Sequence, residues 1–165
     1  MNKSILLSLL FLLTLSFSEA QTVGYTHKIL SSYGCEVKYS VSKQDTSYYI
    51  IVAIKSEKLR FMKQSTMLLK NFDGEVLKLQ GELLDNDLES AGIILGGLLF
   101  PFSEVNSTSQ FKITQEQFEL IKGRIAKIRL TTIPKVHEKS FKKDKIGKKL
   151  YEFYIKAKNQ IDDDF

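Results

Sequence analysis

The sequence of 165 residues contains a single cysteine, Cys35, so it cannot form an intramolecular disulfide. Stability must therefore come from packing. Free cysteine is among the most often buried residue types, and we expect Cys35 to be a small buried hydrophobic residue in a strand. The alternatives are a reactive thiol, which needs a basic and partly exposed setting, and an intermolecular disulfide, which needs exposure.

The motifs of several common active sites are also missing. The chain has no Gly-x-Ser-x-Gly elbow of a serine hydrolase, no phosphate-binding loop and no Gly-x-Gly-x-x-Gly dinucleotide loop. The zinc-protease pattern needs a second histidine one helical turn after the first, and His137-Glu138 lacks it. We expect His27 and His137 to be exposed or structural, and we predict neither a metal nor a cofactor. No catalytic residue can be assigned from the sequence.

Two acidic segments and one asparagine match only short patterns for calcium binding and for N-glycosylation. Asp85 and Asp87, and the run 162–164, could bind calcium, but no EF-hand order surrounds them, so we interpret them as a solvated turn and a frayed tail. Asn106 begins an Asn-x-Thr acceptor pattern for N-glycosylation, which matters only in a eukaryotic secretory pathway.

Residues 1–20 have the order of a cleaved secretory signal peptide: a positive charge, an apolar run over 5–15, and small residues at Ser18 and Ala20. The run is shorter than the roughly 20 residues that cross a bilayer, which argues against a transmembrane anchor. The residue after the cut is Gln21, not the cysteine of a lipoprotein. We predict cleavage between Ala20 and Gln21, and export to the periplasm, the cell envelope or the medium.

The mature chain, residues 21–165, has the composition of one globular domain. The full sequence is 43% hydrophobic and 26% charged, unlike that of a disordered chain. A chain of this length can bury a core, and nothing favours a second domain. The formal net charge is +5.

Alternating apolar residues indicate two hairpins. One spans residues 33–54 around a polar turn at 43–46. The other spans 66–80 around Asp73-Gly74, a pair that supplies the positive φ angles of a tight two-residue turn.

The most apolar stretch of the mature chain is 91–102. We interpret it as a buried strand or a packed loop, with an exposed apolar loop that meets a partner or a membrane surface as the alternative. Further strands are expected at 107–113 and 125–133, and after Pro134 the segment 136–141 is expected to pair back.

Two helices are predicted. Thr114 and Gln117 fit a capping box, which places a short helix near 114–122, and Gly123 is placed to end it. A longer amphipathic helix is expected near 142–161. Its apolar side comprises Ile146, Leu150, Phe153, Tyr154, Ala157 and Ile161. The predicted fold class is therefore α+β, an antiparallel β-sheet built from hairpins with both helices packed on it.

Lysines populate the opposite side of the last helix: Lys142, Lys143, Lys145, Lys148, Lys149, Lys156 and Lys158. We interpret this side mainly as a solvated face. An anionic lipid or polysaccharide of the envelope is its most plausible partner, whereas nucleic acid is not expected because no aromatic stacking motif accompanies the lysines.

The segments 111–118, 127–130 and 141–150 resemble a group of uncharacterised small exported proteins of Bacteroidetes bacteria. The likeness covers the last third of the chain and consists of core and cap residues. It implies an envelope location and no activity.

Two hypotheses for the function follow. The first is a non-enzymatic binding or structural module that contacts a protein partner or an anionic surface through the apolar segment 91–102 or the basic helix. The second is a small hydrolase or ligand-binding protein whose site is assembled from residues distant in sequence. A pocket lined by converging His, Asp, Glu or Tyr side chains would favour the second.

Overall fold

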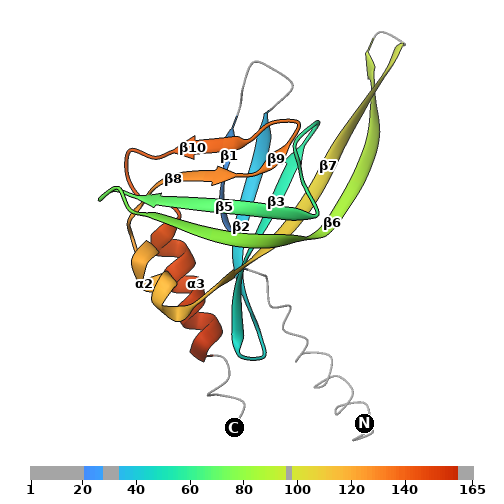
Figure 1. The fold of residues 1–165 in the computed structure, drawn as a ribbon. Helices are drawn as coiled ribbons and strands as arrows, with labels where there is room; N and C mark the ends of the chain where they lie inside the picture. The colour runs from blue at the N-terminus through green and yellow to red at the C-terminus, as the bar shows by residue number, and fades with distance from the viewer. Residues whose placement is uncertain (1–20, 28–33, 96–97, 160–165) are drawn as a thin grey trace, which may run out of the picture.

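A computed structural model describes residues 21–27, 34–95 and 98–159. The predicted signal peptide and the acidic tail therefore lie outside the described residues. Eight antiparallel strands form one sheet in the order β1-β2-β3-β7-β6-β5-β8-β10, which curls almost into a closed barrel (Figure 1). These strands are β1 (Val23–His27), β2 (Cys35–Gln44), β3 (Ser47–Ser56), β5 (Gln64–Asn71), β6 (Val76–Leu95), β7 (Leu98–Ile113), β8 (Ile125–Leu130) and β10 (His137–Ser140). The short strands β4 (Arg60–Phe61) and β9 (Thr132–Ile133) pair separately.

The hydrophobic core fills the inside of this barrel-like sheet. Strand β3 shows why, because buried and half-buried residues alternate along it and successive side chains of a strand point to opposite faces. The largest fully buried side chains are Tyr39, Phe61, Phe111, Phe118, Ile50, Ile54, Leu59, Met67, Leu69, Ile113, Ile125 and Ile128.

Two helices lie side by side next to β2: α2 (Gln115–Ile121) and α3 (Gly147–Asn159) (Figure 1). The capping box predicted for α2 is present, since Gln117 N donates to Thr114 Oγ1 and Thr114 N donates to Gln117 Oε1. Gly123 follows α2 with a φ of 66°, as a left-handed C-terminal position requires. The rings of Phe118 and Tyr154 stack with their centroids 4.4 Å apart and so connect the two helices.

Helix α3 begins later than predicted, at Gly147 and not near 142. The reason is Asp144, whose carboxylate accepts hydrogen bonds from the backbone N–H groups of Gly147 and Lys148 and so caps the helix. Leu150 and Tyr154 are buried, as the apolar stripe predicts, whereas Phe153 is only half-buried.

The predicted α+β class is wrong, because the protein is mostly β. The sequence showed the hairpins, but it did not show that the strands continue into one eight-stranded, nearly closed sheet. Helices α2 and α3 have 7 and 13 residues and are small additions to that sheet.

The two predicted hairpins exist, but both turns differ in length, and the first has two residues, 45–46, and not the four predicted at 43–46. Strands β2 and β3 pair in register to Gln44 and Ser47, around a two-residue turn. Strands β5 and β6 are joined by the four residues 72–75, not by Asp73-Gly74 alone. Asn71 fixes this longer loop, because its side chain accepts from the Glu75 N–H and donates to the Glu75 carboxylate.

The apolar segment 91–102, expected to be a buried strand or a packed loop, is divided between two strands, β6 and β7. It belongs to the far half of a long hairpin in which β6 and β7 pair to Leu95 and Leu98. Strand β5 pairs with β6 only as far as Glu82, and β3 pairs with β7 only from Val105 onwards. Among the described strands, residues 84–95 of β6 therefore pair with no strand except β7, and residues 98–104 of β7 pair with no strand except β6. We call these residues the arm; it projects from the body of the sheet (Figure 1).

Candidate functional site

The two edges of the sheet meet through side chains of β1 and β10. Tyr25 on β1 places its hydroxyl 3.0 Å from the Tyr39 hydroxyl and 3.1 Å from Nε2 of His137 on β10. The other ring nitrogen of His137, Nδ1, lies 3.5 Å from Sγ of Cys35. The His27 ring packs edge to face against the His137 ring, with the ring centroids 5.4 Å apart. We call these five residues the seam.

A cysteine beside a histidine resembles the pair of a cysteine hydrolase, but the chemistry here is different. Burial raises the pKa of the Cys35 thiol to about 11, and burial together with nearby His27 and Lys139 lowers the pKa of His137 to about 4. The pair is therefore a neutral thiol and a neutral imidazole near pH 7, whereas a nucleophile needs the thiolate. Both residues are at most 5% exposed, so a substrate cannot reach them. The seam joins the edges of the sheet.

The prediction that Cys35 is buried in a strand is confirmed. The two histidines, which stand apart in the sequence, lie together in the fold; His137 is buried and His27 is half-buried. Their approach was not predicted, because a separation of more than a hundred residues leaves no local pattern. The side chains of the described residues contain no group of three or more His, Cys, Asp or Glu that could hold a metal ion.

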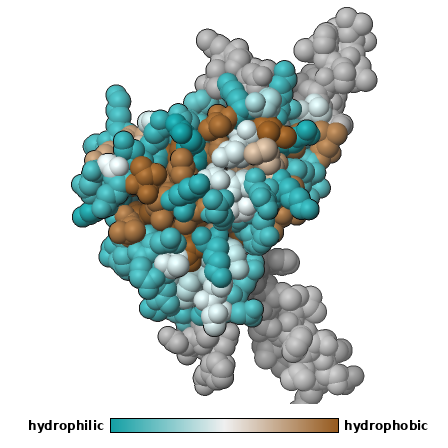
Figure 2. Space-filling model, viewed as in Figure 1, coloured by the Kyte–Doolittle hydropathy of each residue, from teal (hydrophilic) through white to brown (hydrophobic). Residues whose placement is uncertain are grey.

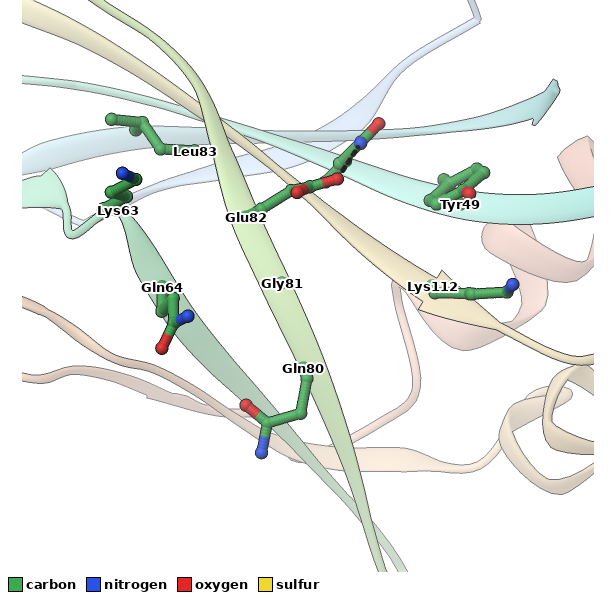
Figure 3. A pocket seen from close by; sticks show the side chains of 9 residues that line it. Tyr49, Lys63, Gln64, Gln80, Gly81, Glu82, Leu83 and Lys112 are labelled. Carbon is green, nitrogen blue, oxygen red and sulfur yellow. Dashed lines mark hydrogen bonds between the residues drawn. The ribbon is translucent and has the colours of Figure 1, made fainter.

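A cavity of about 620 Å³ opens on the outer side of the sheet, where the arm leaves the body (Figure 3). Its lining comes from several elements far apart in the sequence: Tyr49, Lys63, Gln64, Gln80, Gly81, Glu82, Leu83, Gln110 and Lys112. Tyr49 and Lys112 lie on one side of β6, and Lys63 and Gln64 lie on the other (Figure 3). Sequence reasoning missed this site, because only the register of four strands brings these residues together.

A second, smaller cavity of about 240 Å³ lies between α2 and the β5–β6 hairpin. Apolar side chains form most of its wall, among them Leu77, Leu120 and Ile125. Figure 2 shows hydrophobic side chains gathered in this region, where Val76 and Leu120 are exposed.

The near half of the arm has two unlike faces. Asp87 pairs with Asn106 in register and Glu89 pairs with Glu104, so acidic residues lie on one face, and Asp85 lies on the same face of β6. Leu88, paired with Val105, lies on the other face and is 66% exposed. The far half, 91–95 and 98–102, contains no charged residue.

The carboxylates of the acidic face lie close enough together to shift the pKa of Asp87. The hydrogen bond and negative charge of Asp85 raise the pKa of Asp87, with a smaller contribution from Glu89. Lys55 on β3 is 3.3 Å from Glu89 and 3.1 Å from Glu104, and this pairing anchors the arm. The Asn106 side chain, in the glycosylation pattern, donates to Glu89 at 2.6 Å and so also belongs to this network.

The lysines predicted on the outer side of the C-terminal helix are all exposed. Lys149 pairs with Glu152 at 2.7 Å, and Lys156 donates to the Gln21 side chain at 3.1 Å. The carboxylates at 162–164, considered for calcium, lie outside the described residues.

Comparison with protein-family models, curated proteins and solved structures found no match to this chain. None of the helices in the described ranges is both long and apolar enough to span a membrane. The function must therefore be argued from the geometry itself.

Proposed function

We propose that this protein is a non-enzymatic binding module that docks a protein partner with its arm. The observation that carries the proposal is the pairing of the arm, because among the described strands residues 84–95 pair with no strand except β7 and residues 98–104 with no strand except β6. A hairpin that leaves the body of the sheet and carries apolar residues adds little to the core. Leu84 and Leu88 of the arm are 49% and 66% exposed, and exposed apolar surface is typical of interaction sites.

A protein partner fits the arm better than an anionic lipid surface does. The outer edges of the arm have backbone N–H and C=O groups that the described strands leave unpaired, and a partner strand could pair with them. In lipid hydrocarbon the same groups would lack hydrogen-bond partners at high cost. The acidic face of Asp85, Asp87 and Glu89 would also be repelled by anionic headgroups. The expected partner has an apolar groove bordered by basic residues.

A hydrolase is disfavoured by the state of the one pair that resembles a catalytic dyad. Cys35 and His137 are buried and neutral, and they hold the edges of the sheet together. We further propose that docking takes place outside the cytoplasm, which is supported by the signal-peptide pattern of residues 1–20.

Site-specific photo-crosslinking tests the docking proposal in the cells that make the protein. Benzoyl-phenylalanine replaces Leu88 on the arm in one variant and Leu120 on α2 in a matched control, since both leucines are at least half exposed. We expect an adduct of discrete mass from position 88 and not from position 120. The substitution Asp87→Lys, on the opposite face of the arm, should lower the yield of that adduct.

Equal adducts from both positions, or none from position 88, would contradict docking by the arm. Sedimentation with anionic vesicles separates the alternative partner. Co-sedimentation that requires Leu88 would show that the arm binds lipid and not protein.

A further inference from the structure

The outer cavity is built from two neighbouring rows of side chains that cross the sheet. Gln64, Glu82 and Gln110 are paired in register across β5, β6 and β7. Tyr49 and Lys112 are paired in the next row, across β3 and β7. Alternation along the strands directs these side chains away from the core, opposite the buried Ile50, Phe111 and Leu79. The cavity is therefore separate from both the core and the arm.

The charges of the cavity favour an anionic ligand. Lys63 and Lys112 form no ion pair within the part of the chain that the structure describes, so both ammonium groups are available. The cavity has one carboxylate, Glu82, and its Oε1 already accepts a hydrogen bond from Gln110 Nε2 at 2.7 Å (Figure 3). The two ammonium groups, of Lys63 and Lys112, thus outnumber the single carboxylate, which already accepts a hydrogen bond from Gln110.

The neutral groups favour a ligand rich in hydroxyls. Gln64 supplies a primary amide that can both donate and accept hydrogen bonds. Gln80 and Gln110 can each still donate an N–H, although Gln80 Oε1 accepts from Thr66 and Gln110 is bonded to Gln44 and Glu82. Tyr49 supplies a half-buried aromatic ring beside Lys112 (Figure 3). Polar groups next to an aromatic surface are typical of small-molecule sites, and about 620 Å³ lies within their usual range.

The positions of the two lysines favour a ligand that is extended. Lys63 directly precedes β5 and Lys112 lies on β7, so two strand spacings, about 10 Å, separate them across the sheet. They are also offset by three residues, about 10 Å, along the strands, because Lys63 is one residue before Gln64 and Lys112 is two residues after Gln110 of the same row. A single small anion cannot contact both ends of such a site. A chain of linked units with spaced negative charges can.

We propose that this cavity binds an acidic oligosaccharide, a short chain of sugars that carry carboxylates. The lysines at the two ends bind carboxylates, the glutamines bind hydroxyls, and the Tyr49 ring packs against a sugar face. This site lies outside the arm, so it is independent of the docking function proposed above.

Isothermal titration calorimetry with the full mature chain tests the site. The probes are a tetramer of galacturonic acid, the uncharged tetramer of galactose, and a tetraglutamate peptide of similar charge without sugar hydroxyls. We expect only the galacturonate tetramer to bind, and its affinity to fall with added salt because the lysines are exposed to solvent.

Single variants locate the binding. Lys63→Gln and Lys112→Gln should each lower the affinity for the galacturonate tetramer by about tenfold, since each removes a charge-assisted hydrogen bond. Lys78→Gln is the matched control, because Lys78 is an exposed lysine of β6 outside the cavity lining. It should change the affinity by less than about twofold. Tyr49→Ala should also weaken binding, and thermal melting confirms that each variant is folded.

Three results would overturn the proposal. The first is no heat of binding with the galacturonate tetramer. The second is equal affinity for the tetraglutamate peptide, which would show that charge alone is recognised. The third is an equal loss for Lys78→Gln and Lys112→Gln, which would place the binding on a diffuse basic surface outside the cavity.

Discussion

Nδ1 of His137 lies 3.5 Å from Sγ of Cys35, although the two residues are 102 positions apart in the chain. His137 belongs to β10 at one edge of the sheet, and Cys35 belongs to β2, next to the other edge. Their contact, together with the hydrogen bond between Tyr25 and His137, is where the sheet comes closest to closing. The protonation states of these residues therefore affect the stability of the whole fold.

Stability should fall in mild acid because of His137. Its folded pKa of about 4 lies below the unfolded value of about 6.5, so the unfolded chain takes up a proton before the folded one does. The stabilisation that neutral His137 contributes is fully present above pH 6.5 and is lost as the pH falls towards 4. The total loss of unfolding free energy is about 3 kcal/mol. Urea denaturation between pH 7 and pH 4 measures it. The variant His137→Gln should show a smaller pH dependence, whereas His27→Gln should keep most of it; equal slopes for His137→Gln and the native chain would refute the assignment.

The thiol of Cys35 should be nearly inert in the folded protein. With a pKa of about 11 its thiolate fraction at pH 8 is about 100-fold lower than that of a free cysteine, and burial adds a further barrier. Reaction with a chromogenic disulfide reagent should be slow in buffer and fast in guanidinium. Rapid labelling of the native chain would show that the seam opens readily.

The substitution Leu150→Ala should cost about 2 to 5 kcal/mol of unfolding free energy, because Leu150 is fully buried and the change leaves a cavity beneath α3. Leu120→Ala, on the exposed side of α2, serves as the control and should cost less than about 0.5 kcal/mol. Chemical denaturation of both variants provides the comparison. Similar losses would mean that α3 is not packed on the core.

The arm should be dispensable for folding. Leu88 and Val105 are direct partners in the ladder, so replacing residues 89–104 by Asn-Gly would close the hairpin with a two-residue turn. The only ion pairs lost in the described part of the chain are those of Lys55 with Glu89 and Glu104, which are partly exposed and of small value. We expect the unfolding free energy to change by less than about 1 kcal/mol. A loss of several kcal/mol, measured by urea denaturation, would show that the arm supports the body of the sheet.

Local features of the fold could be predicted because neighbouring residues cause them. The capping box of Thr114 and Gln117, the left-handed position of Gly123 and the return of β10 onto β8 all follow from short segments of sequence. The turn between β5 and β6 was predicted with the wrong length. The pair Asp73-Gly74 locally favours a two-residue turn. The side chain of Asn71, through its hydrogen bonds with Glu75, stabilises a four-residue loop instead.

The amino-acid sequence by itself determined the β2–β3 and β5–β6 hairpins, the capped start of α2, the apolar side of α3, the single buried cysteine and the stretch without charge at 91–102. Only the tertiary structure decided that the strands curl into one sheet, that this stretch belongs to an arm, and that Lys63, Glu82 and Lys112 line one cavity. The physical reason is that turns and caps depend on contacts between residues a few positions apart. The curvature of the sheet, the contact of His137 with Cys35 and the cavity depend on the register between strands that are distant in the chain, and no local pattern records that register.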